Sequence, residues 1–462
     1  MKLEEVLLVI LITLSFKLSR SVFSAFAAVI LFLCCFPVAT NSFDNRIVDM
    51  TSTSHFIIHA FGQRQLSTLP QLNDESLHVE LVIEEQLLFP TSMVFIDNNT
   101  LLVTQKNNGN VICTINSTVM SQPAITVEVN NEGFKGLLGI AAMENPSSSS
   151  HTKFVFLYFT ESLGGEETRN RVYRYEWDHE NQVLTNGTMI LDLPAEPESV
   201  HNGGKLETDR NGNLYAVIGD LSRDGQLQNV RQGPAADNTS VIIRIIQNGS
   251  GTADNPFSKS NNEKMQIYYA YGIRNSFGLA IDPISGLLWD TENGDDSYDE
   301  INIVYPGFNS GWNQIMGPIS HSDIEQSDLV EELVVFEGSK YADPVFSWEE
   351  QVGVTDLEFL NSTALGPKYA YNLFVGDINN GNLYFFELNK NRTGFELYDN
   401  DLKELTDQVA DDDQELSEIV FGIGFEEGIT DVETGPDGFL YILTFNGSLY
   451  RILPVTDENR QD

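Results

Sequence analysis

The chain has 462 residues, of which 67 are acidic and 26 are basic, so its formal net charge at pH 7 is −41. A surface this acidic repels phosphate backbones and anionic lipids, which argues against nucleic acid as a partner and leaves cations, neutral small molecules or basic proteins. The apolar fraction of 41% is enough for a real core, and the length fits either several domains or one large all-β or barrel domain.

The first 42 residues contain two apolar runs, Val6 to Phe16 and Val22 to Thr40, which are separated by Lys17 and Arg20. These are the parts of a secretory signal peptide, although a run of about 18 apolar residues could also stay as a membrane anchor. Either way we expect an exported protein, extracellular or at the cell surface, with membrane contact only through this segment. Residues 43–79 are polar and indicate a linker or arm.

N-x-S/T sequons support the exported location and predict a glycoprotein. They occur at Asn98, Asn116, Asn186, Asn238, Asn248, Asn361, Asn391 and Asn446.

From about residue 80 the sequence alternates short apolar strands with turns of Asp, Asn, Pro and Gly. The hairpin pattern at residues 94–104 returns at 206–220, 279–293 and 432–444, with a looser copy at 373–388. Repeated hairpins without helical periodicity predict antiparallel sheets, and about 375 residues fit six blades of four strands. We therefore expect one all-β domain over residues 80–455, a six-bladed β-propeller of four-stranded antiparallel blades.

The segment ESVHNGGKLETDRNGNLYAVIGD, residues 198–220, places His201 just before two glycines and a strand. Histidine suits proton abstraction near neutral pH, and glycines let a ligand approach the backbone closely. This predicts His201 as a catalytic base in a loop that faces a central cavity. The alternative is a histidine that only forms hydrogen bonds within its own loop.

A second segment, residues 269–313, places Arg274 and Asn275 at the entry to a strand, where Arg274 would present a fixed cation to the cavity. A structural arginine bound to backbone carbonyls is the alternative. The loop ENGDDSYDE that follows, residues 292–300, is rich in oxygen ligands, including those of Asp299 and Glu300. Calcium prefers six to eight oxygens, so the loop is a candidate calcium site, or else a plain acidic loop.

Six phrases occur in the order seen in the glucose/sorbosone dehydrogenase family, which the chain resembles from about residue 80 to 455. They are FKGLLGIAA, HNGGKL with DRNGNLYAVIGD, ADNPF, YGIRNSFGLAID, DEINIVYPGFNSGWN and TDVETGPDGFLYILT. The resemblance implies a six-bladed propeller that binds pyrroloquinoline quinone and calcium at the mouth of its central channel.

The resemblance also implies roles for individual residues. His201 matches the histidine that takes the proton from a sugar's anomeric hydroxyl while hydride passes to the quinone. Arg274, with Asn275 beside it, matches the part of the cofactor site next to the quinone oxygens, and the carbonyls of Gly294 and Asp295 match calcium ligands. The expected function is that of a quinone-dependent aldose dehydrogenase, which oxidises a sugar or aldehyde and passes electrons to an acceptor.

The chain departs from the family pattern at several cofactor-binding positions. Phe134 or Lys135 stands where quinone-binding members have glutamine, Val200 replaces an aspartate, Asn379 replaces a lysine, and Gly428 and Thr430 replace two arginines. Because the quinone is a tricarboxylate, the loss of three cations should weaken its binding. Two alternatives therefore stay open: a non-catalytic extracellular propeller that binds glycan or protein, and a calcium-assisted sugar-lactone hydrolase.

Overall fold

The computed structural model describes residues 69–146, 152–164, 167–196, 200–321, 326–397 and 403–456. The predicted signal peptide or anchor at 1–42 and most of the predicted arm at 43–79 lie outside these residues. No helix in the described ranges is long and apolar enough to cross a membrane.

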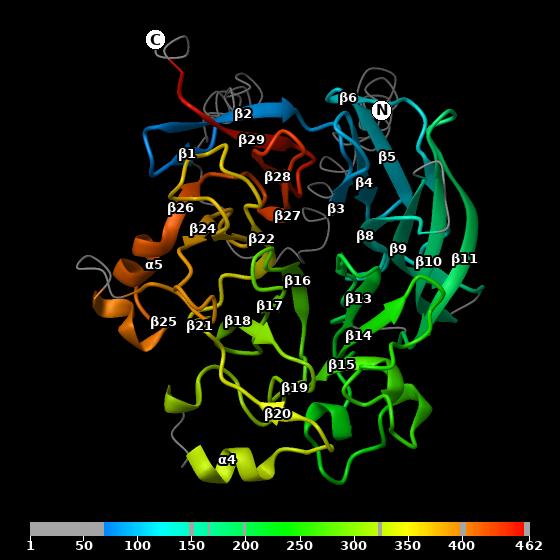
Figure 1. The fold of residues 1–462 in the computed structure, drawn as a ribbon, viewed down its shortest axis with the longest axis vertical. Coiled ribbons are helices and arrows are strands. Elements are labelled where there is room, and N and C mark those ends of the chain that lie inside the picture. The colour runs from blue at the N-terminus through cyan, green and yellow to red at the C-terminus, as the bar shows by residue number, and fades with distance from the viewer. Residues whose placement is uncertain are drawn as a thin grey trace, which may run out of the picture. The chain divides into compact units, whose positions relative to one another are not determined.

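Almost all of the regular structure is β, and the strands form six sheets (Figure 1). The first three sheets contain β3 (Pro90–Phe95), β4 (Thr100–Gln105), β5 (Asn110–Ile115), β6 (Thr118–Val119) and β7 (Ile125–Thr126); β8 (Leu137–Glu144), β9 (Lys153–Ser162), β10 (Thr168–Asp178) and β11 (Val183–Leu193); and β12 (Leu206–Thr208), β13 (Asn213–Ile218), β14 (Val241–Ile246), β15 (Tyr268–Tyr271), β19 (Phe308–Asn309) and β20 (Lys340–Tyr341).

The other three sheets contain β16 (Ser276–Ile281), β17 (Leu288–Glu292), β18 (Asp299–Val304), β21 (Phe346–Trp348) and β25 (Val409–Ala410); β22 (Val354–Phe359), β23 (Leu373–Asp377), β24 (Leu383–Phe386), β26 (Val420–Ile423) and β1 (Gln71–Leu72); and β27 (Ile429–Thr434), β28 (Leu440–Thr444), β29 (Leu449–Pro454) and β2 (Leu77–Ile83). Short helices join them: α4 (Gln326–Glu332), α5 (Asp413–Ile419), and the 3₁₀ helices η1 (Gln226–Gln228), η2 (Glu263–Ile267), η3 (Ile319–His321) and η4 (Lys403–Asp407).

The first strands of the six sheets surround a common axis. They contact one another in the cyclic order β3, β8, β12, β16, β22 and β27, and β27 contacts β3 again. The predicted all-β propeller is therefore confirmed. The expected uniform four-stranded blades are corrected, because the sheets have four to six strands. Several of the added strands, such as β19, β20 and β25, are only two residues long, which is too short for an alternating pattern to reveal.

The recurrent hairpins have a common turn chemistry. An aspartate at the start of each turn accepts hydrogen bonds from backbone N–H groups two to four residues further on, which fixes the reversal of the chain. These residues are Asp97, Asp209, Asp282, Asp377 and Asp437. This shared local bond explains why the same sequence pattern returns in five of the sheets.

The N-terminal strand closes the ring. β2 pairs antiparallel with β29 from the opposite end of the chain, with Leu77 opposite Pro454 and Val79 opposite Ile452. β1 also pairs with β26 in the neighbouring sheet. The strands therefore begin inside the range 43–79 that the sequence indicates as an arm.

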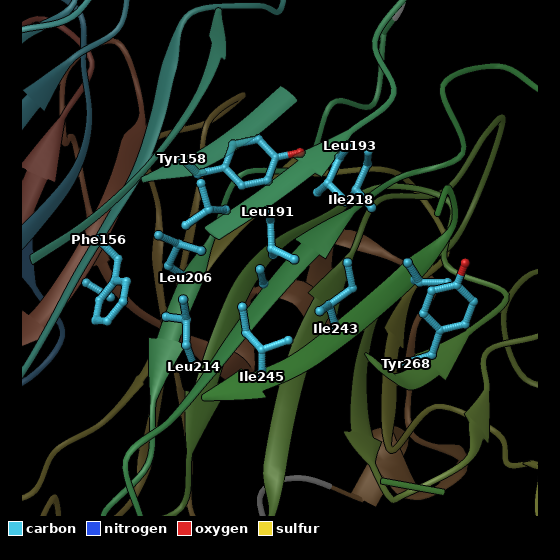
Figure 2. Close-up of a cluster of buried hydrophobic side chains, with 14 of the residues drawn as sticks. Phe156, Tyr158, Leu191, Leu193, Leu206, Leu214, Ile218, Ile243, Ile245 and Tyr268 are labelled. Carbon is cyan, nitrogen blue, oxygen red and sulfur yellow. The ribbon is translucent and has the colours of Figure 1, made fainter. Parts of the chain in front are cut away.

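The hydrophobic core lies between successive sheets. Figure 2 shows one such interface, where side chains of β8–β11 meet those of the sheet that begins with β12. Second strands such as β4, β17 and β28 are buried along their whole length, whereas the outer strand β11 is exposed in its middle. The second strands are thus covered on both faces. They support the first strands of the sheets, which surround the axis and are called the inner strands below.

We predict that Val79→Asp in β2 destabilises the protein strongly. Val79 is 5% exposed and packs with Leu440, Ile442 and Ile452. An unpaired carboxylate there should lower the free energy of unfolding by about 3 kcal/mol or more. Urea unfolding checks this, with Val335→Asp at a 73% exposed valine as the matched control. Equal midpoints for the two variants would show that β2 does not secure the ring.

Candidate active site

A cavity of about 680 Å³ opens at one end of the ring and is lined by residues from all six sheets. The lining residues occur at two recurring places, the start of an inner strand and the loop after a second strand. Thr91, Val200 to Gly203, and Gly353 represent the first place, and Lys106, Asn379 and Phe445 represent the second. Because all inner strands start at this end, residues far apart in sequence face one cavity.

The structure brings most of the predicted site residues together there. His201, Arg274, Asn275, Gly294 and Asp299 all line the cavity. Asp295 does not line the cavity itself, but its Oδ1 forms an ion pair with Nη2 of Arg274 at 2.7 Å.

His201 is held by Asp220. Its Nδ1 lies 2.7 Å from Oδ1 of Asp220, a carboxylate that is 3% exposed and also accepts the backbone N–H of Ser222. A carboxylate only accepts hydrogen bonds, so this contact suits the tautomer of the neutral imidazole that carries its proton on Nδ1 and a lone pair on Nε2. The side chain of His201 is 16% exposed, so its Nε2 can act as a base toward a molecule in the cavity.

The same aspartate connects His201 to Arg274. Oδ2 of Asp220 accepts a 2.8 Å hydrogen bond from Nε1 of Trp312, and the guanidinium of Arg274 lies 5.3 Å from the centre of that indole ring. Arg274 also donates to the carbonyl of Asn293. Arg274 thus binds a backbone carbonyl and also lines the cavity.

The glycines around His201 serve the packing of the protein's own loops. A Cβ on Gly219 would lie 2.5 Å from the carbonyl oxygens of both His201 and Arg274, so only glycine lets these two loops approach each other. Gly204 has φ +122° and faces Leu138 at a distance that leaves no room for a Cβ. The glycines thus have a role in positioning His201, and Gly203 of the same loop also lines the cavity.

The candidate calcium loop is already heavily hydrogen-bonded. The carboxylate of Asp299 accepts the backbone N–H groups of Gly294, Gly353 and Val354, while burial raises its pKa. Gln351 donates to the carbonyl of Asp295. Across the described ranges, no three His, Cys, Asp or Glu side chains are grouped so that they could hold a metal ion.

Glu300, also a predicted ligand, is placed elsewhere. It is 4% exposed, accepts the backbone N–H of Gly317, and does not line the cavity. It lies across β17 and β18 from Glu292, whose carboxylate accepts the backbone N–H of Arg274. Burial raises the pKa of Glu292 to about 7 and that of Glu300 well above its usual range.

Four of the positions at which the sequence departs from the family pattern are on the cavity wall. Phe134, Val200, Asn379 and Thr430 all line it. Lys135 does not, because it is 2% exposed and its Nζ donates to the carbonyl of Glu196. Of the two residues that could stand in place of the family's glutamine, Phe134 is therefore the one on the cavity side, and it is 61% exposed.

Sequence reasoning missed four residues of this site: Asp220, Trp312, Lys106 and Lys205. Lys106 is a cavity cation whose Nζ donates to the carbonyl of Gly133, and burial lowers its pKa. Asp220 had a signal, since it lies in the same quoted segment as His201, two residues after the end of β13. Trp312 follows 92 residues later, and its contact with Asp220 has no local signature.

Lys205 crosses the axis of the ring. Its Nζ lies 2.7 Å from Oδ2 of Asp356 on β22 and 3.2 Å from Oδ1 of Asp431 on β27. In the cyclic order of inner strands, β27 is three places from β12, which Lys205 directly precedes, so the ammonium joins opposite walls. All three side chains are at least nine-tenths buried.

A family model described as Glucose / Sorbosone dehydrogenase matches residues 87–451. The chain belongs to this family. The resemblance drawn from the six sequence phrases is thereby confirmed.

Two curated proteins illustrate the relationship. The aldose sugar dehydrogenase YliI of Escherichia coli is 27% identical over 379 residues, which are 81% of this chain and 92% of that protein. Quinoprotein glucose dehydrogenase B of Acinetobacter calcoaceticus is 26% identical over 260 residues, which are 51% of this chain and 52% of that protein.

A solved structure extends the comparison to the fold. The PQQ-bound form of the aldose sugar dehydrogenase from Streptomyces coelicolor is 21% identical with a TM-score of 0.59. The match covers 83% of this chain and 99% of that one. At this level of identity the likeness concerns the fold of this member of the glucose/sorbosone dehydrogenase family.

We predict that Lys205→Met costs about 3–5 kcal/mol in the free energy of unfolding, because Asp356 and Asp431 lose their cation while they stay buried. Thermal and urea unfolding measure the loss. Lys340→Met, at an exposed lysine, is the control and should change little. A loss below about 1 kcal/mol, typical of a surface ion pair, would contradict the buried bridge.

Proposed function

We propose that this protein is a quinone-dependent sugar dehydrogenase, which oxidises the anomeric hydroxyl of an aldose in the cavity. One observation carries the proposal: the family's histidine position is filled by His201, which is oriented by Asp220 and lines the same cavity as Arg274. The aldose sugar dehydrogenases among its relatives support the substrate class. We also take the six sheets to be six blades, on the basis of the cyclic contacts of their inner strands.

The residues of this chain supply the proton chemistry. Nε2 of His201 takes the proton of the substrate hydroxyl, and the electron pair of that O–H bond becomes available to form the carbonyl. Asp220 stabilises the imidazolium that results, because its Oδ1 lies 2.7 Å from Nδ1 of His201 and accepts a hydrogen bond from the Nδ1–H group. Pyrroloquinoline quinone, when bound, would supply the acceptor for the hydride that leaves the same carbon.

The cavity residues fit such a cofactor, with fewer cations than the family pattern has. Nε of Arg274 and Oδ1 of Asn275 are buried atoms without a hydrogen-bond partner, and both residues line the cavity. Arg274 and Lys106 are the cations that suit the carboxylates of the quinone. Lys205 is engaged by two aspartates, so we do not assign it to the cofactor.

Calcium is part of this proposal, through the carbonyl oxygens of Gly294 and Asp295. The support is the resemblance to the family and the position of Gly294 on the cavity wall. The carboxylates of Asp295 and Asp299 are engaged by Arg274 and by backbone N–H groups, which leaves backbone oxygens as the ligands to expect. Calorimetric titration with calcium, with and without the quinone, tests this, and no binding in either case would remove calcium from the site.

We predict that His201→Ala lowers turnover by about 10²–10⁴-fold while quinone binding persists, because only the proton acceptor is lost. Asp220→Asn should also lower turnover with binding intact, since the imidazole loses its orienting carboxylate. The assay uses protein reconstituted with quinone and calcium, a panel of aldoses and an artificial electron acceptor. His179→Ala, at a 78% exposed histidine, is the matched control. If the wild-type protein neither binds quinone nor reduces the dye with any sugar, the chain is a binding propeller instead.

We predict that Thr430→Arg strengthens quinone binding by roughly 10- to 100-fold, since a charged hydrogen bond to a carboxylate contributes about 1.5–3 kcal/mol. Thr430 lines the cavity at a position where the family pattern has arginine. Fluorescence titration with quinone measures the gain. Thr188→Arg adds the same charge at an exposed threonine outside the cavity and should leave affinity unchanged. Equal affinities for both variants would mean that the quinone does not occupy this cavity.

A further inference from the structure

Six ionisable side chains from three inner strands gather inside the ring, at and below the floor of the cavity. This axial cluster consists of Lys205, Glu207, Asp356, Glu358, Asp431 and Glu433. Lys205 bridges Asp356 and Asp431 in a first layer, as described above. The three glutamates lie two positions further along each strand, on the same side by the period of a β-strand, and form a second layer.

The second layer contains no cation. Glu207 belongs to β12 and Glu358 to β22, and these strands are not neighbours in the ring. The charge of Glu358 nevertheless affects the pKa of Glu207. After burial, the charge of Glu358 is the largest cause that raises the pKa of both Glu207 and Glu433. The three carboxyl groups therefore lie near enough to one another inside the ring for their charges to interact.

The other inner strands do not balance this charge. β3 and β16 carry no ionisable residue, and β8 carries only Glu144, at its exposed end and paired with Lys153. Five carboxyl groups thus share the single ammonium of Lys205. Because unpaired buried charges are costly, the cluster must bind something positive.

One oxygen of the cluster indicates what is bound. Oδ2 of Asp356 accepts from Lys205 and from the backbone N–H of Val432, but its buried Oδ1 has no donor. Asp356 and Asp431 bind the same ammonium, so their carboxyl groups lie close together, and burial and the charge of Asp431 raise the pKa of Asp356. No three carboxylates of the described ranges are grouped to hold a metal ion, which favours protons over a cation.

The glutamates can exchange protons near neutral pH. Burial raises the pKa of Glu207 to about 8 and that of Glu358 to about 7, and it raises the pKa of Asp356 and of Glu433 well above their usual ranges. Glu207, Glu358 and Glu433 are only half-buried, so water reaches them within the ring. Lys205 lines the cavity that also holds His201, so the cluster adjoins the proposed site of proton abstraction.

We propose that the axial cluster is a proton-binding site at the floor of the cavity, and that it receives the proton which His201 takes from the substrate hydroxyl. His201 gains the proton as the O–H bond breaks and returns to its neutral form when a carboxylate of the cluster takes that proton through water. The carboxyl group then releases it to solvent. The catalytic part rests on the proposed function, whereas proton binding itself does not.

The first experiment uses the full chain without cofactor. Infrared difference spectra between pH 5 and pH 9 follow the C=O band of protonated carboxyl groups, in wild-type protein and in Glu207→Gln/Glu358→Gln. We expect the wild-type protein to lose absorbance with midpoints at about 7 and 8, and the double variant to keep only the part near 7 that Glu292 contributes and to lack the component at about 8. Glu415→Gln, at a buried glutamate on α5, is the control and should retain it.

Thermal melting gives an independent readout and shows that the variants fold. A carboxyl whose pKa is raised in the folded state destabilises it once pH exceeds the unfolded-state pKa, so the cost is absent at pH 4 and present at pH 8. The double variant should therefore melt at a higher temperature than wild type at pH 8, and at the same temperature at pH 4. A lower melting temperature at pH 8 would overturn proton binding by these glutamates.

The second experiment measures turnover against pH in reconstituted protein. In the double variant we expect unchanged quinone affinity and a changed pH profile of turnover between pH 6 and 9. The loss of turnover should be smaller than the roughly 10²-fold loss expected when a direct base is missing. An unchanged profile would overturn the link to catalysis. Absent infrared titration, or a titration abolished by stoichiometric calcium, would overturn the proton site. Lack of sugar oxidation by wild type would refute the proposed function alone.

Discussion

The ion pairs of Lys205 with Asp356 and Asp431 are the constraint on which the centre of this protein depends. One ammonium joins inner strands on opposite sides of the ring, over a separation of 226 residues between Lys205 and Asp431. Lys205 also lines the cavity, so the cavity has a fixed charge at this point of its wall. Removal of the lysine would leave two carboxylates buried without a partner, which is far more costly than the loss of a surface pair.

The location of the candidate site follows from the topology of the ring. All inner strands begin at the same end, so the loops that precede them and the loops after the second strands converge on one cavity. The strands are held by packed side chains between sheets, while the loops stay free to carry chemistry. His201, Asp220, Trp312 and Arg274 show the result, since contacts among three separate segments orient one base and one cation.

The acidic residues inside the ring differ in their protonation from those at the surface. The formal net charge of −41, counted over the whole chain, makes the protein repulsive to anions. Inside, burial raises the pKa of several carboxyl groups, so acids that count as charged in the sequence hold protons in the fold. The cations at the cavity are few, and two of the three, Arg274 and Lys205, are already bound to carboxylates. A bound anion must therefore compete with the protein's own acids.

The sequence by itself determined the repeating unit and the family. Hairpins could be predicted because each depends on local bonds, such as those that the turn aspartate Asp209 accepts from its own loop. His201 and Arg274 could be predicted because they stand inside continuous phrases. The two-residue strands that widen the sheets could not, because they form only when distant loops pass along an existing edge.

Tertiary structure alone decided the rest of the site. The partner of His201 could not be predicted, because only the fold places Asp220 next to its Nδ1. Glu300 belongs to β18, and its side chain does not line the cavity. The six residues of the axial cluster belong to three strands that are remote in sequence. Each reads in the sequence as an ordinary surface charge. Only closure of the ring buries Lys205, Asp356 and Asp431 and places one lysine among five acids, and neither propensity nor spacing encodes that proximity.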